Sequence, residues 1–225
     1  MEILPDAGSV ASRGAAIVAA EARAAVGARG KFIVAVSGGS TPWRMLRALA
    51  GEEVPWEGVH VVQVDERVAP AGHPDRNLTR LRESLLAHAT LRPERIHAMP
   101  VESPDLDAAA AQYARTLREI AGSPPVLDLV HLGLGQDGHT ASLVPGDPVL
   151  GVTETDVAPT GVYQGWRRMT LTYPVVNRSR RILWLVTGSG KAGMLRRLRD
   201  ADPSIPAGRV LGDRALVLAD RAAAG

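Results

Sequence analysis

The sequence predicts an α/β fold in which helices cover both faces of a mostly parallel β-sheet. Short, continuous apolar runs alternate along the chain with longer alanine-rich or amphipathic segments, as strands alternate with covering helices in such sheets. Hydrophobic residues make up 45% and aromatic residues only 4%, so the core must consist mainly of Val, Leu, Ile and Ala. With 225 residues and no strong linker, low-complexity run or internal repeat, residues 1–225 are expected to form a single domain.

The first elements follow from local patterns. Residues 10–27 are rich in alanine and Gly30 follows, which predicts a helix that ends near a glycine able to take positive φ. Residues 32–36 form a continuous apolar run, typical of a strand buried on both faces. Pro42 suits the first turn of the next helix, expected over 43–49.

The rest of the chain repeats this alternation. Further strands are expected at 59–64, 96–99, 127–132, 169–172, 182–186 and 214–219, and further helices at 77–87, 107–120 and up to residue 198. The stretch before residue 169 is predicted to be irregular. Ligands bind such sheets beyond the carboxyl ends of the strands, and four polar or glycine-rich loops fall at those ends.

Composition excludes several classes of function. The chain has no cysteine, which rules out disulfides, a thiolate nucleophile and cysteine-bound zinc. Its first residues lack the charged and apolar pattern of a signal peptide, and no stretch approaches the roughly 20 apolar residues that span a bilayer. We therefore expect a soluble, cytoplasmic protein without a membrane partner.

The charge pattern does not predict a nucleic-acid partner. The formal net charge is +2, and the basic residues are nearly all scattered arginines, with Lys31 and Lys191 as the only lysines. Nucleic-acid binding usually needs a clustered basic surface. The expected assembly is a monomer or a weak homo-oligomer.

The first loop has the sequence Ser37-Gly38-Gly39-Ser40-Thr41. Its glycines let the backbone approach a ligand closely, and the start of the following helix offers unpaired amide donors. The hydroxyls of Ser40 and Thr41 add donors, so the loop suits a phosphate monoester. The spacing is too short for a Walker loop and no lysine follows. An ordinary glycine turn with a helix cap is the alternative interpretation.

The second loop begins with Asp65-Glu66-Arg67, three charged residues at the end of an apolar strand. Such charges must be solvated, form ion pairs or bind a ligand. Arg67 is a candidate for a bidentate contact with phosphate oxygens, and a surface ion pair is the alternative. Asn77, farther along the chain, is placed to reach the same rim.

The third loop, residues 133–142, carries the candidate catalytic residues. His139 can accept a proton near neutral pH, and Asp137 is close enough in sequence to orient or charge-balance it. The surrounding glycines indicate a tight turn that exposes the imidazole. No second histidine lies at metal-ligand spacing, so a metal site is not expected. A structural or merely exposed histidine is the alternative.

The fourth group consists of Arg167 and Arg168, before a predicted strand, and Lys191, after another. Arg168 and Lys191 are candidates to balance a substrate phosphate, whereas Arg167 is expected to face solvent. Ser189 lies between two glycines but lacks the full spacing of a nucleophile elbow. Covalent acyl transfer is therefore not expected.

Taken together, these loops resemble one family, the 6-phosphogluconolactonases. The similar segments run in order from about residue 9 to residue 223, and the most specific of them is Asp-Gly-His-Thr-Ala-Ser at 137–142. The other segments are 36–42, 64–67, 168–172 and 190–192.

This resemblance implies a modified Rossmann-like sheet of the sugar-phosphate isomerase type. It also implies hydrolysis of 6-phosphoglucono-δ-lactone in the oxidative pentose phosphate pathway, with no metal and no cofactor. The family's catalytic histidine maps onto His139, which we expect to act as a general base on water. Its phosphate-binding positions map onto Gly39, Ser40, Thr41, Arg67 and Arg168.

Three departures from the family pattern concern the shape of the pocket. Arg76 stands where serine is common, Val144 replaces a frequent phenylalanine, and Gly165-Trp166 stands where a Pro-Pro pair often precedes the arginine. None of them removes a group that the reaction needs.

Two other functions fit parts of the pattern. A glucosamine-6-phosphate deaminase of the same fold would carry an acidic residue a few positions after His139, but residues 140–145 contain no carboxylate. A non-catalytic sugar-phosphate sensor would usually carry an additional DNA-binding helical segment, for which this length leaves no room.

Overall fold

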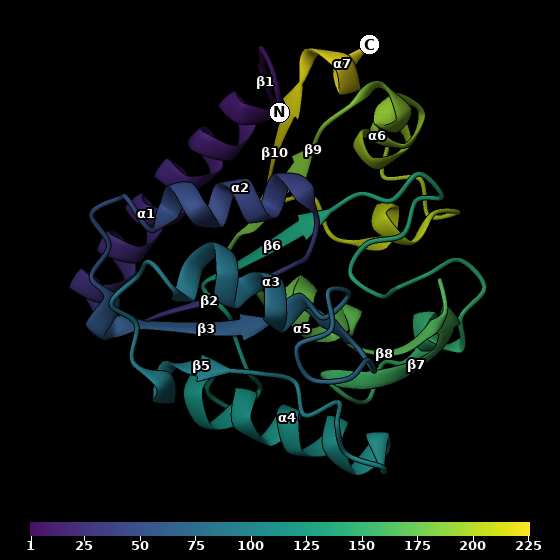
Figure 1. Ribbon diagram of the computed structural model, residues 1–225. Helices are drawn as coiled ribbons and strands as arrows, with labels where there is room; N and C mark the ends of the chain where they lie inside the picture. The colour runs from purple at the N-terminus through teal and green to yellow at the C-terminus, as the bar shows by residue number, and fades with distance from the viewer.

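In the computed structural model, which describes residues 1–225, a seven-stranded sheet crosses the centre of the molecule (Figure 1). Every pair of neighbouring strands in this sheet is parallel. In spatial order the strands are β1 (Glu2–Leu4), β10 (Ala215–Asp220), β9 (Ile182–Val186), β6 (Leu129–Gly133), β2 (Phe32–Val36), β3 (Val59–Gln63) and β5 (Ile96–His97). The predicted α/β fold with a mostly parallel sheet is thus confirmed.

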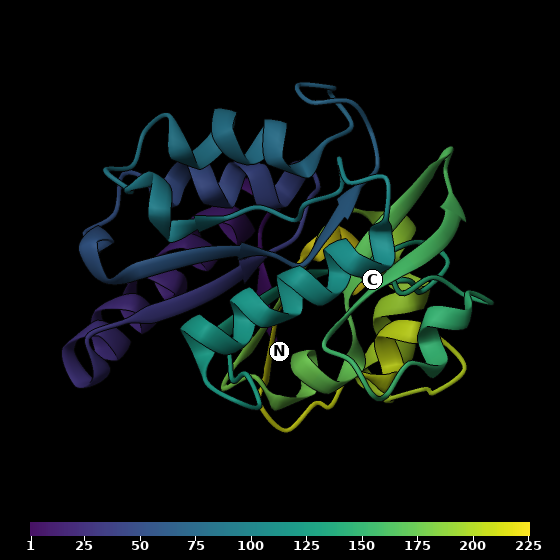
Figure 2. The same ribbon diagram turned by 90° about the horizontal axis from the view of Figure 1, so that it is seen from below.

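Helices cover both faces of this sheet (Figures 1 and 2). On one face lie α1 (Ala7–Arg29), α2 (Ser40–Leu49) and α3 (Asn77–Leu81), the last continued by a π-helical turn at Arg82–Leu86. On the other lie α4 (Leu106–Ala121), α5 (Tyr173–Arg178), α6 (Ala192–Arg199) and α7 (Arg221–Ala224). Short 3₁₀ turns occupy Trp56–Gly58, Pro93–Arg95, Pro148–Gly151, Ser189–Lys191 and Pro206–Arg209.

Strand β2 shows why a continuous apolar run was needed at the centre. Phe32, Val34 and Val36 pack into the core beneath α1 and α2. Ile33 and Ala35 point to the opposite face and join the core beneath α4. Because successive side chains of a strand alternate in direction, both faces of a fully covered strand must be apolar.

Helix α1 begins and ends at well-defined caps. The Asp6 carboxylate accepts a hydrogen bond from the amide of Ser9 at 2.7 Å, which satisfies one free donor of the first turn. Gly30 ends the helix with φ of 72°, as the sequence predicts. The helix starts three residues before the predicted range because Asp6, and not the alanine pattern, sets its first turn.

A second, three-stranded antiparallel sheet lies beside the first and was only partly predicted. It consists of β4 (Asp65–Arg67), β8 (Trp166–Leu171) and β7 (Val157–Tyr163). The predicted irregular structure before residue 169 is wrong over β7. Pro159, Gly161 and a register shift between Pro159 and Val162 break the alternation by which strands are recognised.

The boundary of the first sheet also differs from the prediction. The strand predicted at 59–64 ends at Gln63, and Asp65–Arg67 already belongs to the second sheet. The helix predicted at 77–87 is divided between α3 and the π-helical turn. None of the helices combines the length and the apolar character that crossing a bilayer requires. The single-domain organisation stays our prediction, supported by the pairing of β1 with β10 from opposite ends of the chain.

Asp128 joins three segments at the amino end of β6. Its buried carboxylate accepts hydrogen bonds from the amide of Ile33 at 2.8 Å and from Arg29 at 2.6 Å, and it pairs with Arg180 at 3.4 Å. Loss of these contacts leaves the Ile33 amide buried without an acceptor, which is more costly than the loss of a surface ion pair.

We expect Asp128→Ala to lower the free energy of unfolding by about 2 kcal/mol, as measured by urea denaturation. The control is Asp213→Ala, since the Asp213 side chain is 71% exposed and pairs only with Arg214. That change should stay within about 0.5 kcal/mol of the original protein. Equal midpoints for the two variants would contradict this role of Asp128.

Candidate active site

A polar cavity of about 280 Å³ opens at the carboxyl ends of β2, β6 and β9, between the parallel sheet and the second sheet. Eleven of the twelve site residues predicted from sequence line it. They are Ser37, Gly38, Gly39, Ser40, Thr41, Asp65, Arg67, Asn77, His139, Arg168 and Lys191. The twelfth, Asp137, is hydrogen-bonded to His139. The structure therefore brings the imidazole and the glycine–serine loop to a single rim, as the sequence argument required.

The glycine–serine loop leads directly into α2, whose first amides lie at the cavity. Gly39 is the N-cap residue, with φ of 133°, and no side chain caps the helix. A glycine suits this position because its φ is rarely adopted by other residues. The uncapped amides and the exposed hydroxyl of Ser40 are available to an anionic ligand.

Ser37 and Thr41 serve the structure of the loop. The Ser37 hydroxyl donates to the backbone oxygen of His131 at 2.9 Å, and its amide donates to the His131 ring at 3.3 Å. Burial lowers the pKa of His131 to about 3, so this ring is neutral and accepts a hydrogen bond. The Thr41 hydroxyl is 2.7 Å from that of Thr187 and links the loops that follow β2 and β9.

Gly38 and Asn77 fit closely together. A Cβ atom on Gly38 would lie 2.2 Å from the Asn77 side-chain oxygen. Asn77 in turn donates to the backbone oxygen of Asp65 at 3.0 Å and to its carboxylate at 3.3 Å. Asn77 is buried. It lies at the rim as predicted, where its side chain holds Asp65 in the cavity wall.

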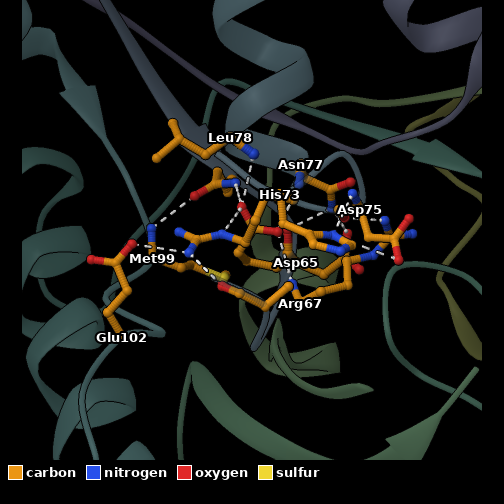
Figure 3. A network of polar contacts seen from close by, with 12 residues as sticks. Asp65, Arg67, His73, Asp75, Asn77, Leu78, Met99 and Glu102 are labelled. Carbon is orange, nitrogen blue, oxygen red and sulfur yellow. Dashed lines mark hydrogen bonds and ion pairs between the residues drawn. The ribbon is translucent and has the colours of Figure 1, made fainter. Parts of the chain in front are cut away.

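A buried carboxylate, that of Glu66, organises the second loop. It accepts hydrogen bonds from the amides of Arg67, Asn77 and Leu78 at 2.7–2.8 Å and from the side chain of Gln63 at 2.8 Å. Figure 3 shows the polar contacts of this region, with Asp65, Arg67, Asn77 and Leu78 close together. Of the three charged residues at 65–67, Glu66 is therefore the paired one.

Arg76 supplies the balancing charge. It is buried, its Nε lies 3.4 Å from Glu66, and its Nη1 donates to Glu102 at 3.0 Å and to the backbone oxygen of Ala69 at 2.9 Å. Arg76, one of the three departures from the family pattern, thus stabilises the second loop from behind and does not line the cavity.

Arg67 and Arg168 form the positive side of the cavity. They are directly opposite each other on the antiparallel strands β4 and β8. Each has a buried Nε without a hydrogen-bond partner. Like charges opposite each other destabilise a sheet, and buried donors normally have acceptors. Arg67 and Arg168 therefore keep guanidinium donors free beside the cavity that they line, whereas Arg167 is exposed as predicted.

Asp65 lies close to this pair of cations. Its Oδ2 accepts a hydrogen bond from the Ser142 hydroxyl at 2.7 Å, which fixes the carboxylate in the wall. Burial lowers the pKa of Arg168, and the negative charge of Asp65 counteracts part of that shift. Asp65 thus balances part of the positive charge of the site and leaves the rest for a ligand.

His139 and Asp137 form a tight pair on the third loop. The Nδ1 atom of His139 lies 2.6 Å from Oδ1 of Asp137. Partial burial alone would raise the pKa of Asp137, but hydrogen bonds from the backbone and ring of His139 and from Tyr163 outweigh it and lower that pKa. An ionised Asp137 fixes the ring proton on Nδ1. Nε2 makes no hydrogen bond to the protein and is free to accept a proton.

Glycines shape this loop around the imidazole. Gly138 has φ of 84°, and the amide of Gly135 donates to the backbone oxygen of His139 at 2.8 Å. A Cβ atom on Gly135 would lie 2.1 Å from Nδ1 of His139 and 2.6 Å from Asp137. Only glycine leaves room for the histidine ring here.

Three residues in or beside the cavity were not predicted from sequence. Tyr163 donates its hydroxyl to Asp137 at 3.0 Å, and Gln164 and Thr187 line the cavity. Thr187 directly follows β9. It could have been predicted, because ligands bind beyond the carboxyl ends of parallel strands. Tyr163 and Gln164 lie in the stretch that was predicted to be irregular and carried no motif.

Lys191 completes the cavity from the 3₁₀ turn after β9. It is half-buried, and burial lowers its pKa, while Asp137 opposes that shift. Among the His, Asp and Glu side chains, no group of three or more converges as a metal site would. The chemistry available in the cavity is therefore that of one oriented imidazole, three cations and the carboxylate of Asp65.

Fold and site together define an α/β enzyme whose polar cavity is lined by one imidazole and three cationic side chains. The chain belongs to the glucosamine-6-phosphate isomerase/6-phosphogluconolactonase family, whose sequence model matches residues 5–218.

Individual relatives agree with this assignment. The chain is 36% identical to a 6-phosphogluconolactonase of Mycobacterium tuberculosis, over 100% of this chain and 96% of the relative. It is 38% identical to one of Synechocystis, over 80% and 77% of the two chains. The crystal structure of a 6-phosphogluconolactonase from Thermotoga maritima superposes with a TM-score of 0.85 at 26% identity, covering 97% of each chain. A monomeric glucosamine-6-phosphate deaminase gives a TM-score of 0.84 at 20% identity, which shows a shared fold alone.

We expect Gly135→Ala to displace the His139 ring and break its contact with Asp137, because the new methyl group would overlap the ring. The measurement is the NMR signal of the His139 Nδ1 proton, which should shift or broaden beyond detection. Gly133→Ala is the matched control, since a Cβ atom there meets nothing within 4 Å. An unchanged signal in Gly135→Ala would show that the loop accommodates the methyl group and that the predicted overlap is wrong.

Proposed function

We propose that the protein hydrolyses 6-phospho-D-glucono-1,5-lactone to 6-phospho-D-gluconate, the lactonase step of the oxidative pentose phosphate pathway, in the cytoplasm. The observation that carries the proposal is the meeting of the His139–Asp137 pair and the Arg67–Arg168 pair in one cavity. The curated relatives named 6-phosphogluconolactonase, with 36% and 38% identity over most of the chain, support the same substrate.

The anion site supports a substrate that carries a phosphate. In our proposal the phosphate lies between the uncapped amides of α2 and the guanidinium groups of Arg67 and Arg168. Arginine suits this role because its donors match the oxygens of a phosphate in pairs. Lys191 would add a third positive charge at the rim.

The His139–Asp137 pair supports general base catalysis on water. Nε2 of His139 would take a proton from a water molecule, whose oxygen then attacks the lactone carbonyl carbon. The tetrahedral intermediate would collapse with cleavage of the bond to the ring oxygen, and the imidazolium would return the proton to that oxygen. The ring opens to a hydroxyl and a carboxylic acid, which loses its proton to solvent. Amide donors of the loops would stabilise the developing oxyanion.

The deaminase alternative is less well supported by the loop that carries His139. The nearest carboxylate after the His139 loop is Asp147, and it does not line the cavity. Asp147 accepts hydrogen bonds from the amides of Val149 and Gly161, both at 2.9 Å, and so stabilises the connection between η4 (Pro148–Gly151) and β7. An isomerising deaminase would need further acid–base groups at the substrate, and this loop supplies none.

The assembly and partners stay predictions. The large hydrophobic side chains that are exposed, Met1, Ile3, Val162 and Leu211, are few, which supports a monomer or weak homo-oligomer. The absence of a nucleic-acid partner rests, as before, on the scattered arginines.

We expect His139→Ala to reduce the lactonase rate by about 10²–10⁴-fold while the protein stays folded, because general acid–base help is lost. The assay follows acid release from freshly prepared lactone, with the spontaneous rate subtracted. His88→Ala is the control, since His88 is exposed and outside the cavity. Ammonia release from glucosamine 6-phosphate without lactone hydrolysis would favour the deaminase, and a near-normal rate in His139→Ala would refute the assigned base.

We also propose that the reaction needs no metal ion, since one imidazole paired with a carboxylate is the base and no converging ligand group accompanies it. Dialysis against a chelator should therefore leave the lactonase rate unchanged within experimental error. A loss of rate that Zn²⁺, Mg²⁺ or Mn²⁺ restores would overturn this part of the mechanism and leave the substrate assignment open to the assay above.

A further inference from the structure

At the turn between β7 and β8, the side chain of Tyr163 contacts both the His139–Asp137 pair and Arg168. We propose that Tyr163 is a positioning residue that holds the His139–Asp137 pair and Arg168 in their relative places. This inference rests on the proposed lactonase function and adds a residue that no sequence motif identifies.

The hydroxyl of Tyr163 fixes the carboxylate behind the base. It donates to Oδ2 of Asp137 at 3.0 Å, while Oδ1 of the same carboxylate faces Nδ1 of His139 at 2.6 Å. With both oxygens engaged, the carboxylate cannot rotate without losing a hydrogen bond. The tyrosine ring also meets the imidazole edge-on, with 5.3 Å between the ring centroids. Rotation of His139 away from the cavity is therefore opposed on two sides.

The ring of Tyr163 also holds a cation. The guanidinium carbon of Arg168 lies 4.9 Å from the ring centroid, a cation–π contact. Nη2 of Arg168 donates to the backbone oxygen of Tyr163 at 3.2 Å and is 3.4 Å from the side-chain oxygen of Gln164. Because the Nε atom of Arg168 keeps no protein partner, these contacts orient the group without saturating it.

The turn itself is held in one conformation. Tyr163 pairs with Trp166 across β7 and β8, and the two residues between them, Gln164 and Gly165, have φ of 50° and 84°. Two positive φ angles in a two-residue hairpin turn match the twist of the strands. Proline, with φ fixed near −65°, does not fit at position 165. The Gly165-Trp166 departure from the family pattern thus makes this turn possible.

Trp166 anchors the far side of the turn. Its indole Nε1 donates to the Asp75 carboxylate at 2.9 Å, and its ring meets that of His73 edge-on at 5.3 Å. Arg67 donates to the backbone oxygen of Asp75 at 2.6 Å. His73, Asp75 and Arg67 lie together in Figure 3. The hairpin is thereby tied to the loop after β4, which supports Tyr163 on the side away from Asp137 and Arg168.

Hydroxyl and ring have separable roles, which two substitutions distinguish. Tyr163→Phe keeps the ring and removes the donor, so we expect kcat to fall about tenfold with KM little changed. The acid limb of the pH–rate profile should move to higher pH, because a carboxylate without its tyrosine donor binds the protonated imidazole more strongly. Tyr163→Leu also removes the ring, and KM should then rise about tenfold as Arg168 loses its cation–π partner.

The control is Val162→Ala, since Val162 is the neighbouring residue of the same strand and is 71% exposed. It should leave kcat, KM and the pH profile as they are. The NMR signal of the His139 Nδ1 proton provides a readout without turnover, and it should shift in Tyr163→Phe but not in Val162→Ala.

These readouts separate the two proposals. If the original protein is active and the Tyr163→Phe variant has the same kcat, the same acid limb of the pH–rate profile and the same NMR signal, the proposed role of Tyr163 is wrong. If the original protein has no lactonase activity but the NMR signal still shifts in Tyr163→Phe, the proposed function is wrong and the positioning of His139 by Tyr163 is supported. Equal KM values in Tyr163→Leu and the original protein would overturn the cation–π part of the inference.

Discussion

Glu66 carries a negative charge into the interior at the point where the chain passes from the parallel sheet to the three-stranded one. An unpaired buried charge is very unfavourable, so its oxygens must be saturated. The amides that saturate them belong to Arg67, Asn77 and Leu78, and Arg76 neutralises the charge. The same contacts fix the orientation of β4 and the start of α3, and with them one wall of the cavity. A single satisfied carboxylate thus fixes β4 against the start of α3 at the edge of the site.

Local patterns sufficed for the elements that are apolar on both faces. The strands at 32–36 and 182–186 match the prediction to the residue, because each run is continuous and is bounded by polar residues or glycine. The candidate site was predictable for a related reason. Parallel strands bring their carboxyl ends to one edge, so loops that are distant in sequence, such as those of Thr41 and His139, had to meet there.

What escaped prediction depends on contacts between distant segments. Nothing in the local sequence shows that the Glu66 carboxylate faces the amides of α3, or that Arg67 and Arg168 pair across β4 and β8. Tyr163 lies on a strand interrupted by proline and glycine, and only the turn at Gln164 and Gly165 brings it to Asp137. Of the departures from the family pattern, Val144 is simply buried, Arg76 supports the second loop from behind the cavity, and Gly165-Trp166 forms and anchors the turn beside Tyr163.

The place of β1 in the sheet has a consequence for biosynthesis. This first strand pairs with the last one, Glu2 opposite Leu218, and α1 packs over a core that includes Leu218. While the chain is still on the ribosome, β1 has no partner strand and part of the apolar side of α1 has nothing to cover. Such long-range pairing slows folding and leaves the emerging chain exposed to aggregation. The amino-terminal segment therefore reaches its final place only after β10 has been synthesised and has left the ribosome.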